Sequence, residues 1–176
     1  MLRLPIVGVM GSSQLAWEDY AVPLGRWLAK QPVHLLTGGG AGVMTSVSEA
    51  FVTVTPRQGL AIGCLPTEAR DGQFVLRAGY PNPFIEIPIV TPLNINGKSA
   101  GVNRNFVNIL TADIVIALPG NVGTLNEVEL ALQFGKPLIL YGPDDYFVDF
   151  PQAVTRYTDL PQVTAWTETQ LQLLNA

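Results

Sequence analysis

The sequence predicts an α/β protein whose core is a doubly wound parallel sheet, and three observations support this. Short apolar runs alternate with longer amphipathic stretches, which is the pattern of strands buried on both faces and separated by helices. Glycine-rich turns follow several of these runs and lead into helices, as in Rossmann-like folds. A chain of 176 residues suits one ordinary domain with a sizeable core, so we assign residues 1–176 to a single domain.

The first half of the chain begins with the clearest βα pair. The solid apolar run Ile6-Val7-Gly8-Val9-Met10 predicts a strand, and residues 15–30 carry apolar side chains at helical spacing. By the same criteria we expect, in order, a strand at 33–37, a helix at 43–52 and a strand at 60–65.

The periodicity fails between Pro66 and Pro83, where Gly72, Gly79 and Pro81 interrupt the chain. These residues predict a long loop. A loop of this length in a compact domain is usually a lid, a binding loop or a subunit contact.

The second half returns to alternating strands and helices. The run Ile114 to Leu118 is the clearest strand in the chain, and Gly135 predicts the end of the helix that follows it. The remaining expected elements are a strand at 84–90, a polar turn at 94–99, a helix at 102–110, a helix ending near 134, a strand at 138–141, an irregular helix after 144, a short strand at 163–166 and a terminal helix from 167.

Composition excludes several classes of partner. The formal net charge is -4, the pI is about 4.8, and no basic run occurs, so neither nucleic acid nor an anionic membrane surface is an expected partner. Charged residues make up only 14% of the chain, against roughly 25% in an average soluble domain. We therefore expect a homo-oligomer, a dimer or tetramer, in which another copy covers apolar surface.

Cysteine and histidine usage restricts the chemistry. Cys64 and His34 are the only residues of their types, which excludes an internal disulfide and a structural zinc site, and we expect no metal ligands. Both side chains are expected to be structural, so Ser-His and Cys-His nucleophilic catalysis are disfavoured. No signal peptide and no apolar stretch near the ~20 residues of a membrane span is evident, so a cytoplasmic location is expected.

Three loops that follow predicted strands have the composition of a ligand site. They are Gly11-Ser12-Ser13, the glycine cluster from Thr37 to Met44, and Pro119 to Thr124. Each loop leads into a helix, where unpaired N–H groups and the helix dipole favour an anion. Because strand carboxyl ends share one sheet edge, we expect Thr37, Gly120 and Gly123 to lie together there and to favour a mononucleotide-like or other phosphorylated ligand.

Two charged residues near these loops have a functional and a structural interpretation. Arg104 could clamp a phosphate bidentately, or it could form a surface salt bridge or a helix-cap contact. Glu127 could act in catalysis, or it could simply stabilise a helix near its N-terminus. The complete dinucleotide pattern Gly-x-Gly-x-x-Gly is absent, and so is the phosphate-loop pattern Gly-x-x-x-x-Gly-Lys-Ser/Thr. NAD binding and ATP hydrolysis therefore have little support.

Three motifs occur in a characteristic order between Gly8 and about Gly142. They read Thr37-Gly38-Gly39-Gly40-x-Gly42-Val43-Met44, then Arg104, then Pro119-Gly120-Asn121-x-Gly123-Thr124-x-x-Glu127. This order resembles the Lonely Guy (LOG) superfamily, once described as possible lysine decarboxylases, which includes the molybdenum cofactor carrier proteins. The resemblance implies a Rossmann-like fold and makes Arg104 and Glu127 the catalytic pair if the protein is a hydrolase of nucleoside 5′-monophosphates.

The chain departs from the hydrolase signature at three positions. Asn121 replaces the second glycine, Asn126 replaces the first of two glutamates, and Asn105 replaces the lysine after Arg104. Loss of a carboxylate and a cation should weaken a site that stabilises an oxocarbenium-like transition state. The opening strand, the segment Asn103 to Phe106 and the short length are closer to the molybdenum cofactor carriers.

The resemblance therefore favours a carrier that binds the molybdenum cofactor, a phosphorylated pterin, without turning it over. The alternatives are a LOG-type phosphoribohydrolase that cleaves the N-glycosidic bond and a protein that only senses a nucleotide. The residues expected to bind the ligand are Gly11, Ser12, Thr37, Gly38, Gly39, Gly40, Gly42, Asn103, Arg104, Gly120, Asn121, Gly123 and Thr124. We expect Gly39→Val to abolish binding by placing a branched side chain where ligand oxygens approach.

Overall fold

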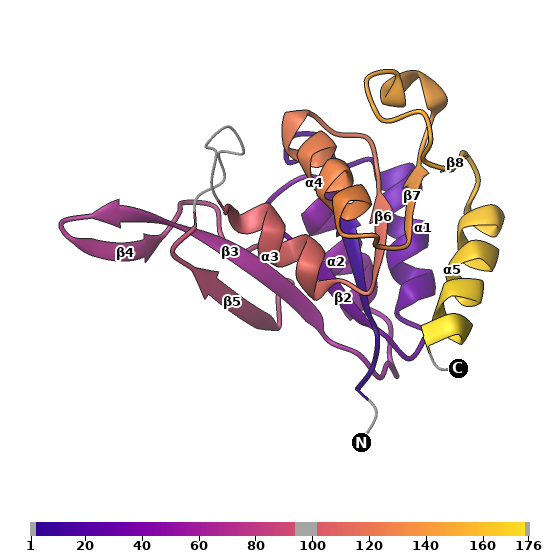
Figure 1. The fold of residues 1–176 in the computed structure, drawn as a ribbon. Helices are drawn as coiled ribbons and strands as arrows, with labels where there is room; N and C mark the ends of the chain where they lie inside the picture. The colour runs from indigo at the N-terminus through magenta and orange to yellow at the C-terminus, as the bar shows by residue number, and fades with distance from the viewer. Residues whose placement is uncertain (1–2, 94–101, 175–176) are drawn as a thin grey trace.

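The computed structural model describes residues 3–93 and 102–174, and these residues form a mostly parallel sheet flanked by helices (Figure 1). The strands are β1 (Ile6–Met10), β2 (His34–Thr37), β3 (Ala61–Arg70), β4 (Gln73–Leu76), β5 (Ile87–Thr91), β6 (Ile114–Ala117), β7 (Leu138–Tyr141) and β8 (Arg156–Tyr157). The helices are α1 (Glu18–Leu28), α2 (Val43–Val52), α3 (Arg104–Thr111), α4 (Val122–Gln133) and α5 (Leu160–Leu174), with a 3-10 turn at Asp144–Phe147. The predicted doubly wound α/β fold is confirmed.

The strand order explains where a ligand site can form. The sheet runs β4-β3-β2-β1-β6-β7-β8, and β5 pairs with β3 in parallel. The chain builds outward from β1 through β2 to β3, then crosses to the other side of β1 and continues through β6 to β8. The direction of winding therefore reverses beside β1, and ligands of open α/β sheets bind at the strand carboxyl ends near such a reversal.

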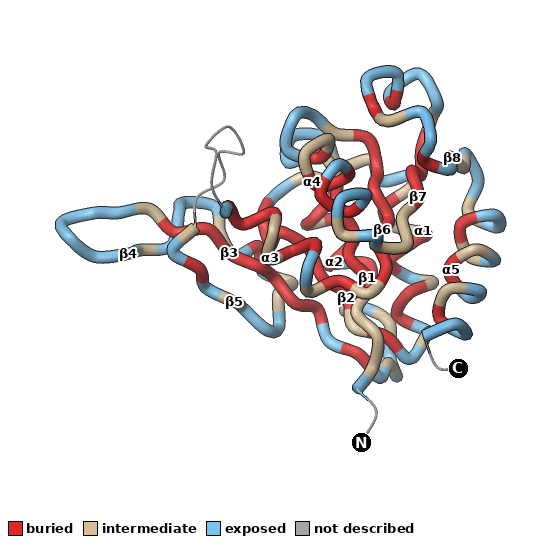
Figure 2. The backbone as a smooth tube through the Cα atoms, viewed as in Figure 1, coloured by how far each residue is buried: buried red, intermediate tan, exposed pale blue. Residues whose placement is uncertain are grey.

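Each face of the sheet has its own core, which follows from the alternation of strand side chains. On β1 and β6, Val7, Val9, Ile114 and Ile116 belong to the cluster formed with α1, α2 and α5. The intervening Met10, Val115 and Ala117 belong to the opposite cluster, formed with α3 and α4. Figure 2 shows the resulting buried centre of the chain. Apolar residues on both faces explain why these strands are solid hydrophobic runs in the sequence.

The predicted loop at 66–83 is wrong in its first half. Strand β3 extends to Arg70 and pairs with β4 in an antiparallel hairpin that projects from the body of the protein (Figure 1). Asp71 and Gly72 form the turn, and both have positive φ values of 51° and 77°. An Asp-Gly pair between alternating residues is a strong hairpin signal, because this turn needs positive φ at both central positions.

The predicted strand at 163–166 is also wrong, because these residues lie within α5. Val163, Thr167 and Leu171 are buried at intervals of four residues, which is the spacing of one helix face. The short strand in this region is β8, just before the helix. Elsewhere the boundaries shift by a few residues: α1 begins at Glu18 rather than 15, and β5 spans 87–91 rather than 84–90. The turn expected at 94–99 lies outside the described residues.

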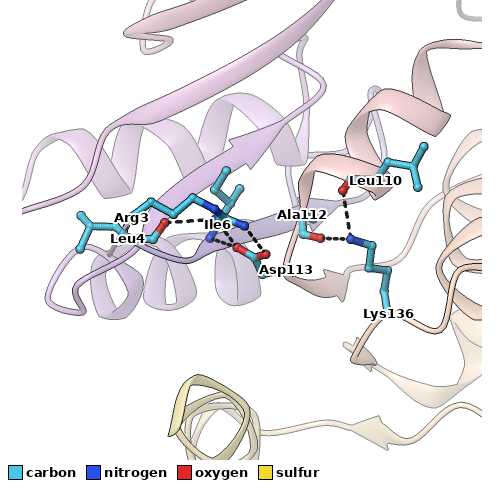
Figure 3. Close-up of polar contacts among 7 residues, drawn as sticks. All are labelled: Arg3, Leu4, Ile6, Leu110, Ala112, Asp113 and Lys136. Atoms are coloured by element: carbon cyan, nitrogen blue, oxygen red, sulfur yellow. Dashed lines mark hydrogen bonds and ion pairs between the residues drawn. The ribbon is translucent and has the colours of Figure 1, made fainter. Parts of the chain in front are cut away.

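Asp113 ties the N-terminal segment to the start of β6 (Figure 3). Its carboxylate accepts two hydrogen bonds of 2.7 Å from the Arg3 guanidinium and one of 2.8 Å from the Ile6 N–H. Burial acts to raise the pKa of Asp113, but these hydrogen bonds, with the charges of Arg3 and Lys136, outweigh it and lower the pKa. Lys136 also donates to the Leu110 and Ala112 carbonyls at the end of α3.

We expect Asp113→Asn to lower the free energy of unfolding by about 1 kcal/mol at pH 7. Because the pKa of Asp113 is lower in the folded protein, the carboxylate stabilises the fold above its unfolded pKa, and this stabilisation is lost as the pH falls through the folded value. Urea unfolding of both proteins at several pH values should show a difference that shrinks below about pH 4. The exposed Asp149→Asn serves as the control, and a pH-independent difference would contradict the assignment.

Within the described residues, no helix is both long enough and apolar enough to cross a membrane.

Candidate functional site

A cavity of about 100 Å³ lies at the carboxyl ends of β1, β2 and β6, where the change of winding direction places it. It is bounded by the loop after β1, the start of the glycine cluster and the first turns of α3 and α4. The lining residues are Val9, Met10, Gly11, Ser12, Ser13, Gly38, Met44, Tyr80, Arg104, Asn105, Asn121, Gly123, Thr124 and Glu127.

Eight of the residues singled out in the sequence line this cavity. They are Gly11, Ser12, Gly38, Arg104, Asn121, Gly123, Thr124 and Glu127. Six others do not line it: Thr37, Gly39, Gly40, Gly42, Asn103 and Gly120. The shared sheet edge is thus present, but only part of each glycine loop reaches the cavity.

The glycines behind the lining are needed for close packing. A Cβ on Gly39 would collide with Leu65, and one on Gly42 would collide with the backbone of Ser12. Several amides of this loop are also used within the protein. The Gly39 N–H donates to the Thr37 hydroxyl at 3.1 Å, and the Val43 N–H donates to the Ser12 carbonyl at 2.9 Å. These two amides of the glycine cluster are therefore already engaged and are not free for a ligand.

The start of α4 has backbone N–H groups without a partner in the helix. The first hydrogen bond of this helix runs from the Leu125 N–H to the Asn121 carbonyl, so the amides of residues 122–124 have no partner within the helix. No side chain caps this end, and its first turn holds no acidic residue. A Cβ added to Gly123 would meet no atom within 4 Å, so the backbone here borders open space. The loop between β6 and α4 can therefore approach an anion closely.

Arg104 is buried beside the cavity. The Asn103 side chain caps α3 by accepting from the Asn105 N–H at 2.9 Å, which places Arg104 in the first turn. Its Nη1 donates to the carbonyls of Gly38 at 2.5 Å and Cys64 at 3.1 Å. Its Nε is buried and has no partner among the described residues. Arg104 therefore forms neither of the bonds expected for a surface role, and it retains donor capacity at the cavity.

Glu127 is buried at the same cavity. Its Oε1 accepts from the Asn108 side-chain amide at 3.1 Å. Burial raises the pKa of the Glu127 carboxyl, and this effect outweighs the opposing influence of the Arg104 charge and the Asn108 hydrogen bond. The described residues include no ion pair between Arg104 and Glu127, although both line the cavity. A carboxyl with a raised pKa can hold a proton beside a bound ligand.

Asn105 and Asn126 contact each other at the wall of the cavity. The Asn105 amide nitrogen donates to the Asn126 side-chain oxygen at 2.9 Å and to the Gly123 carbonyl at 3.4 Å. The two departures from the hydrolase signature thus form one neutral, hydrogen-bonded pair.

Tyr80 and Met44 also line the cavity, although the sequence did not single them out as ligand contacts. Tyr80 comes from the irregular segment between β4 and β5, and no motif in the sequence marks it. Cys64 and His34 have the structural places expected. Burial raises the pKa of the Cys64 thiol to about 11, and His34 begins β2 at the end away from the cavity.

Comparison with known proteins agrees with this fold. A family model described as the SLOG cluster4 family matches residues 4–171. The chain therefore belongs to the SLOG cluster4 family, within the LOG-like superfamily, and the resemblance noted in the sequence is confirmed.

Among solved structures, the chain is similar to the molybdenum cofactor binding protein of the phototrophic bacterium Rippkaea orientalis. The identity is 30%, the TM-score is 0.75, and the match covers 96% of this chain and 98% of the other. A second similar structure is the molybdenum cofactor carrier protein of Chlamydomonas reinhardtii, with 27% identity, a TM-score of 0.71 and coverage of 97% and 99%. An uncharacterized protein of Archaeoglobus fulgidus is 26% identical over 137 residues, which is 77% of this chain and 78% of that protein.

Proposed function

We propose that the protein is a molybdenum cofactor carrier that binds this phosphorylated pterin and releases it unchanged. The observation that carries the proposal is the Asn105–Asn126 pair. The hydrolase signature places a lysine and a glutamate at these positions, whereas here two amides satisfy each other at 2.9 Å. A neutral pair provides a stable wall for the cavity but no charge to stabilise an oxocarbenium-like transition state.

The donors at the cavity fit the phosphate end of such a ligand. The amides of residues 122–124, which have no partner within α4, suit phosphate oxygens, as does the buried guanidinium of Arg104 with its unpartnered Nε. A cavity of about 100 Å³ is well below the roughly 300–1,000 Å³ of pockets that enclose a drug-sized ligand. We therefore place the phosphate inside and the pterin rings toward the mouth.

Gly123→Ala tests this placement without disturbing the fold. The new methyl group meets no protein atom within 4 Å, and alanine is a better helix former than glycine, so the unfolding free energy should be unchanged or higher. The same methyl group would crowd the ligand oxygens at the start of α4 and weaken cofactor binding about tenfold. Fluorescence titration with purified cofactor measures the change. The control is Gln133→Ala, at the other end of α4, and equal affinities for all three proteins would place the ligand elsewhere.

A LOG-type phosphoribohydrolase is the second candidate, and one observation favours it. Arg104 and Glu127, the pair that the superfamily resemblance makes catalytic, line the same cavity, and burial raises the pKa of the Glu127 carboxyl, which is the direction that favours a general acid. If this candidate is correct, purified protein should release the base from AMP or a related nucleotide, and Glu127→Gln should abolish the release.

We also propose that the protein works as a homo-oligomer. Val102, two residues before α3, and Val122, the first residue of α4, are each 65% exposed, and Leu110 on α3 is 53% exposed. This part of the chain therefore exposes apolar side chains. Contact between copies of the chain would bury these apolar side chains and remove them from water.

A further inference from the structure

The segment between β4 and β5 is fixed onto the glycine cluster by Asn82. The Asn82 N–H donates to the Gly39 carbonyl at 2.8 Å, and the side-chain amide donates to the Gly40 carbonyl at 2.9 Å. The side-chain oxygen accepts from the Phe84 N–H at 3.1 Å. Asn82 is 5% exposed, so these bonds are shielded from water and hold the segment in one position.

This anchoring sets the position of the Tyr80 ring. The ring packs so closely on Gly40 that a Cβ there would come within 2.8 Å of the ring carbon Cε1. The Arg104 Cζ lies over the same ring, 5.7 Å from its centroid, within the range of a cation–π contact. The Tyr80 ring therefore lies close to both Gly40 and the Arg104 guanidinium, and it lines the cavity.

The Arg104 side chain makes two kinds of contact with the protein. Its Nη1 is fixed by the Gly38 and Cys64 carbonyls, and the Tyr80 ring lies near the guanidinium. A guanidinium has five N–H donors, and the two carbonyls engage only Nη1. A buried donor such as Nε normally finds a partner by side-chain rotation unless packing prevents it. The Nε–H of Arg104 therefore has no partner among the described residues and could donate to a ligand.

We propose that Tyr80 is a positioning residue that fixes the Arg104 guanidinium for ligand binding. This inference rests on the proposed ligand site in the cavity, but it concerns a residue and a segment that the superfamily motifs do not include. Tyr80 and Asn82 lie in the second half of the loop expected at 66–83, and Tyr80 forms part of the wall of the cavity.

Two substitutions of Tyr80 separate the ring from the hydroxyl group. Tyr80→Phe keeps the ring over Arg104, so cofactor affinity should stay within about twofold of the wild-type value. Tyr80→Leu removes the aromatic face, and affinity should fall about tenfold, which corresponds to a partly buried cation–π contact. The control is Tyr146→Leu, because Tyr146 is 56% exposed and packs on Trp17 outside the cavity. A tenfold loss in Tyr80→Phe would overturn the proposal.

A double-mutant cycle with Arg104→Gln tests whether Tyr80 acts through Arg104. If it does, Tyr80→Leu should cause no further loss of affinity in the Arg104→Gln protein. Additive losses would show that Tyr80 contacts the ligand itself and would overturn the positioning role. AMP and inorganic phosphate are titrated beside the cofactor. If AMP or phosphate binds and the cofactor does not, the proposed ligand is wrong. The double-mutant cycle can then still be measured with the ligand that binds.

A measurement without ligand tests the positioning of Arg104 independently of the proposed function. The Nε–H resonance of Arg104 in a nitrogen-15 NMR spectrum reports on the ring and on solvent access. We expect the same shift and slow exchange in the wild type and Tyr80→Phe, and a displaced, faster-exchanging signal in Tyr80→Leu. An unchanged signal in Tyr80→Leu would show that the ring does not position Arg104, whatever the ligand.

Discussion

Arg104→Gln is expected to weaken cofactor binding about 100-fold, which corresponds to removal of one partner from a buried charged contact. Arg104 is the buried cation of the cavity, and its unpartnered Nε is the donor that a phosphate oxygen would satisfy. Glutamine is shorter and neutral, so it supplies neither the charge nor the reach. Titration with the cofactor measures the loss.

The variant also needs a stability measurement, because the Gly38 and Cys64 carbonyls lose the donor that they share. We expect the unfolding free energy to fall by about 1–3 kcal/mol, which still leaves the protein folded if its stability is ordinary. Arg156→Gln is the matched control, since the guanidinium of Arg156 donates to the Phe150 carbonyl at 3.4 Å and Arg156 is not among the residues that line the cavity. Wild-type affinity in folded Arg104→Gln would show that the phosphate does not bind here.

Gly39→Val is expected to lower the unfolding free energy by about 2–5 kcal/mol. Gly39 has a φ of 73°, which costs a branched residue about 1–3 kcal/mol, and its new Cβ would collide with Leu65. This differs from the expectation based on sequence alone, in which valine would block the ligand. Gly39 lies behind the cavity lining, so its substitution should act on folding.

Urea unfolding of Gly39→Val and Gly123→Ala distinguishes the two interpretations. We expect a lower midpoint for Gly39→Val and an unchanged or higher midpoint for Gly123→Ala, with the loss of affinity in the latter due to the cavity alone. If Gly39→Val unfolded at the wild-type midpoint and failed to bind the cofactor, valine would be blocking the ligand as the sequence suggested.

The βα alternation was predictable because each central strand is buried on both faces. Val7, Val9 and Met10 form an unbroken apolar run for this reason, and the glycine turns that follow such runs mark the edge where ligands bind. The errors occurred where a local preference competes with packing. Val163 resembles a strand residue by its β-branched side chain, but its spacing from Thr167 and Leu171 places it on a helix face.

The candidate site was predictable to the extent that sequence motifs mark the residues lining the cavity. Arg104, Gly123 and Glu127 were found because they follow a pattern along the chain, and they line the cavity. Tyr80 could not be found in this way, since its position depends on the buried hydrogen bonds of Asn82 to a loop 42 residues away. Likewise, the sequence could not show that Asn105 and Asn126 are partners across two helices.

Incubation of one protein preparation with the molybdenum cofactor and, separately, with nucleoside 5′-monophosphates tests the central claim most directly. Chromatography of the released ligand after each incubation separates intact cofactor, intact nucleotide and free base. A carrier should bind the cofactor saturably, return it chemically unchanged and release no base. Base release that is lost in Glu127→Gln would contradict the carrier and assign the site to a phosphoribohydrolase.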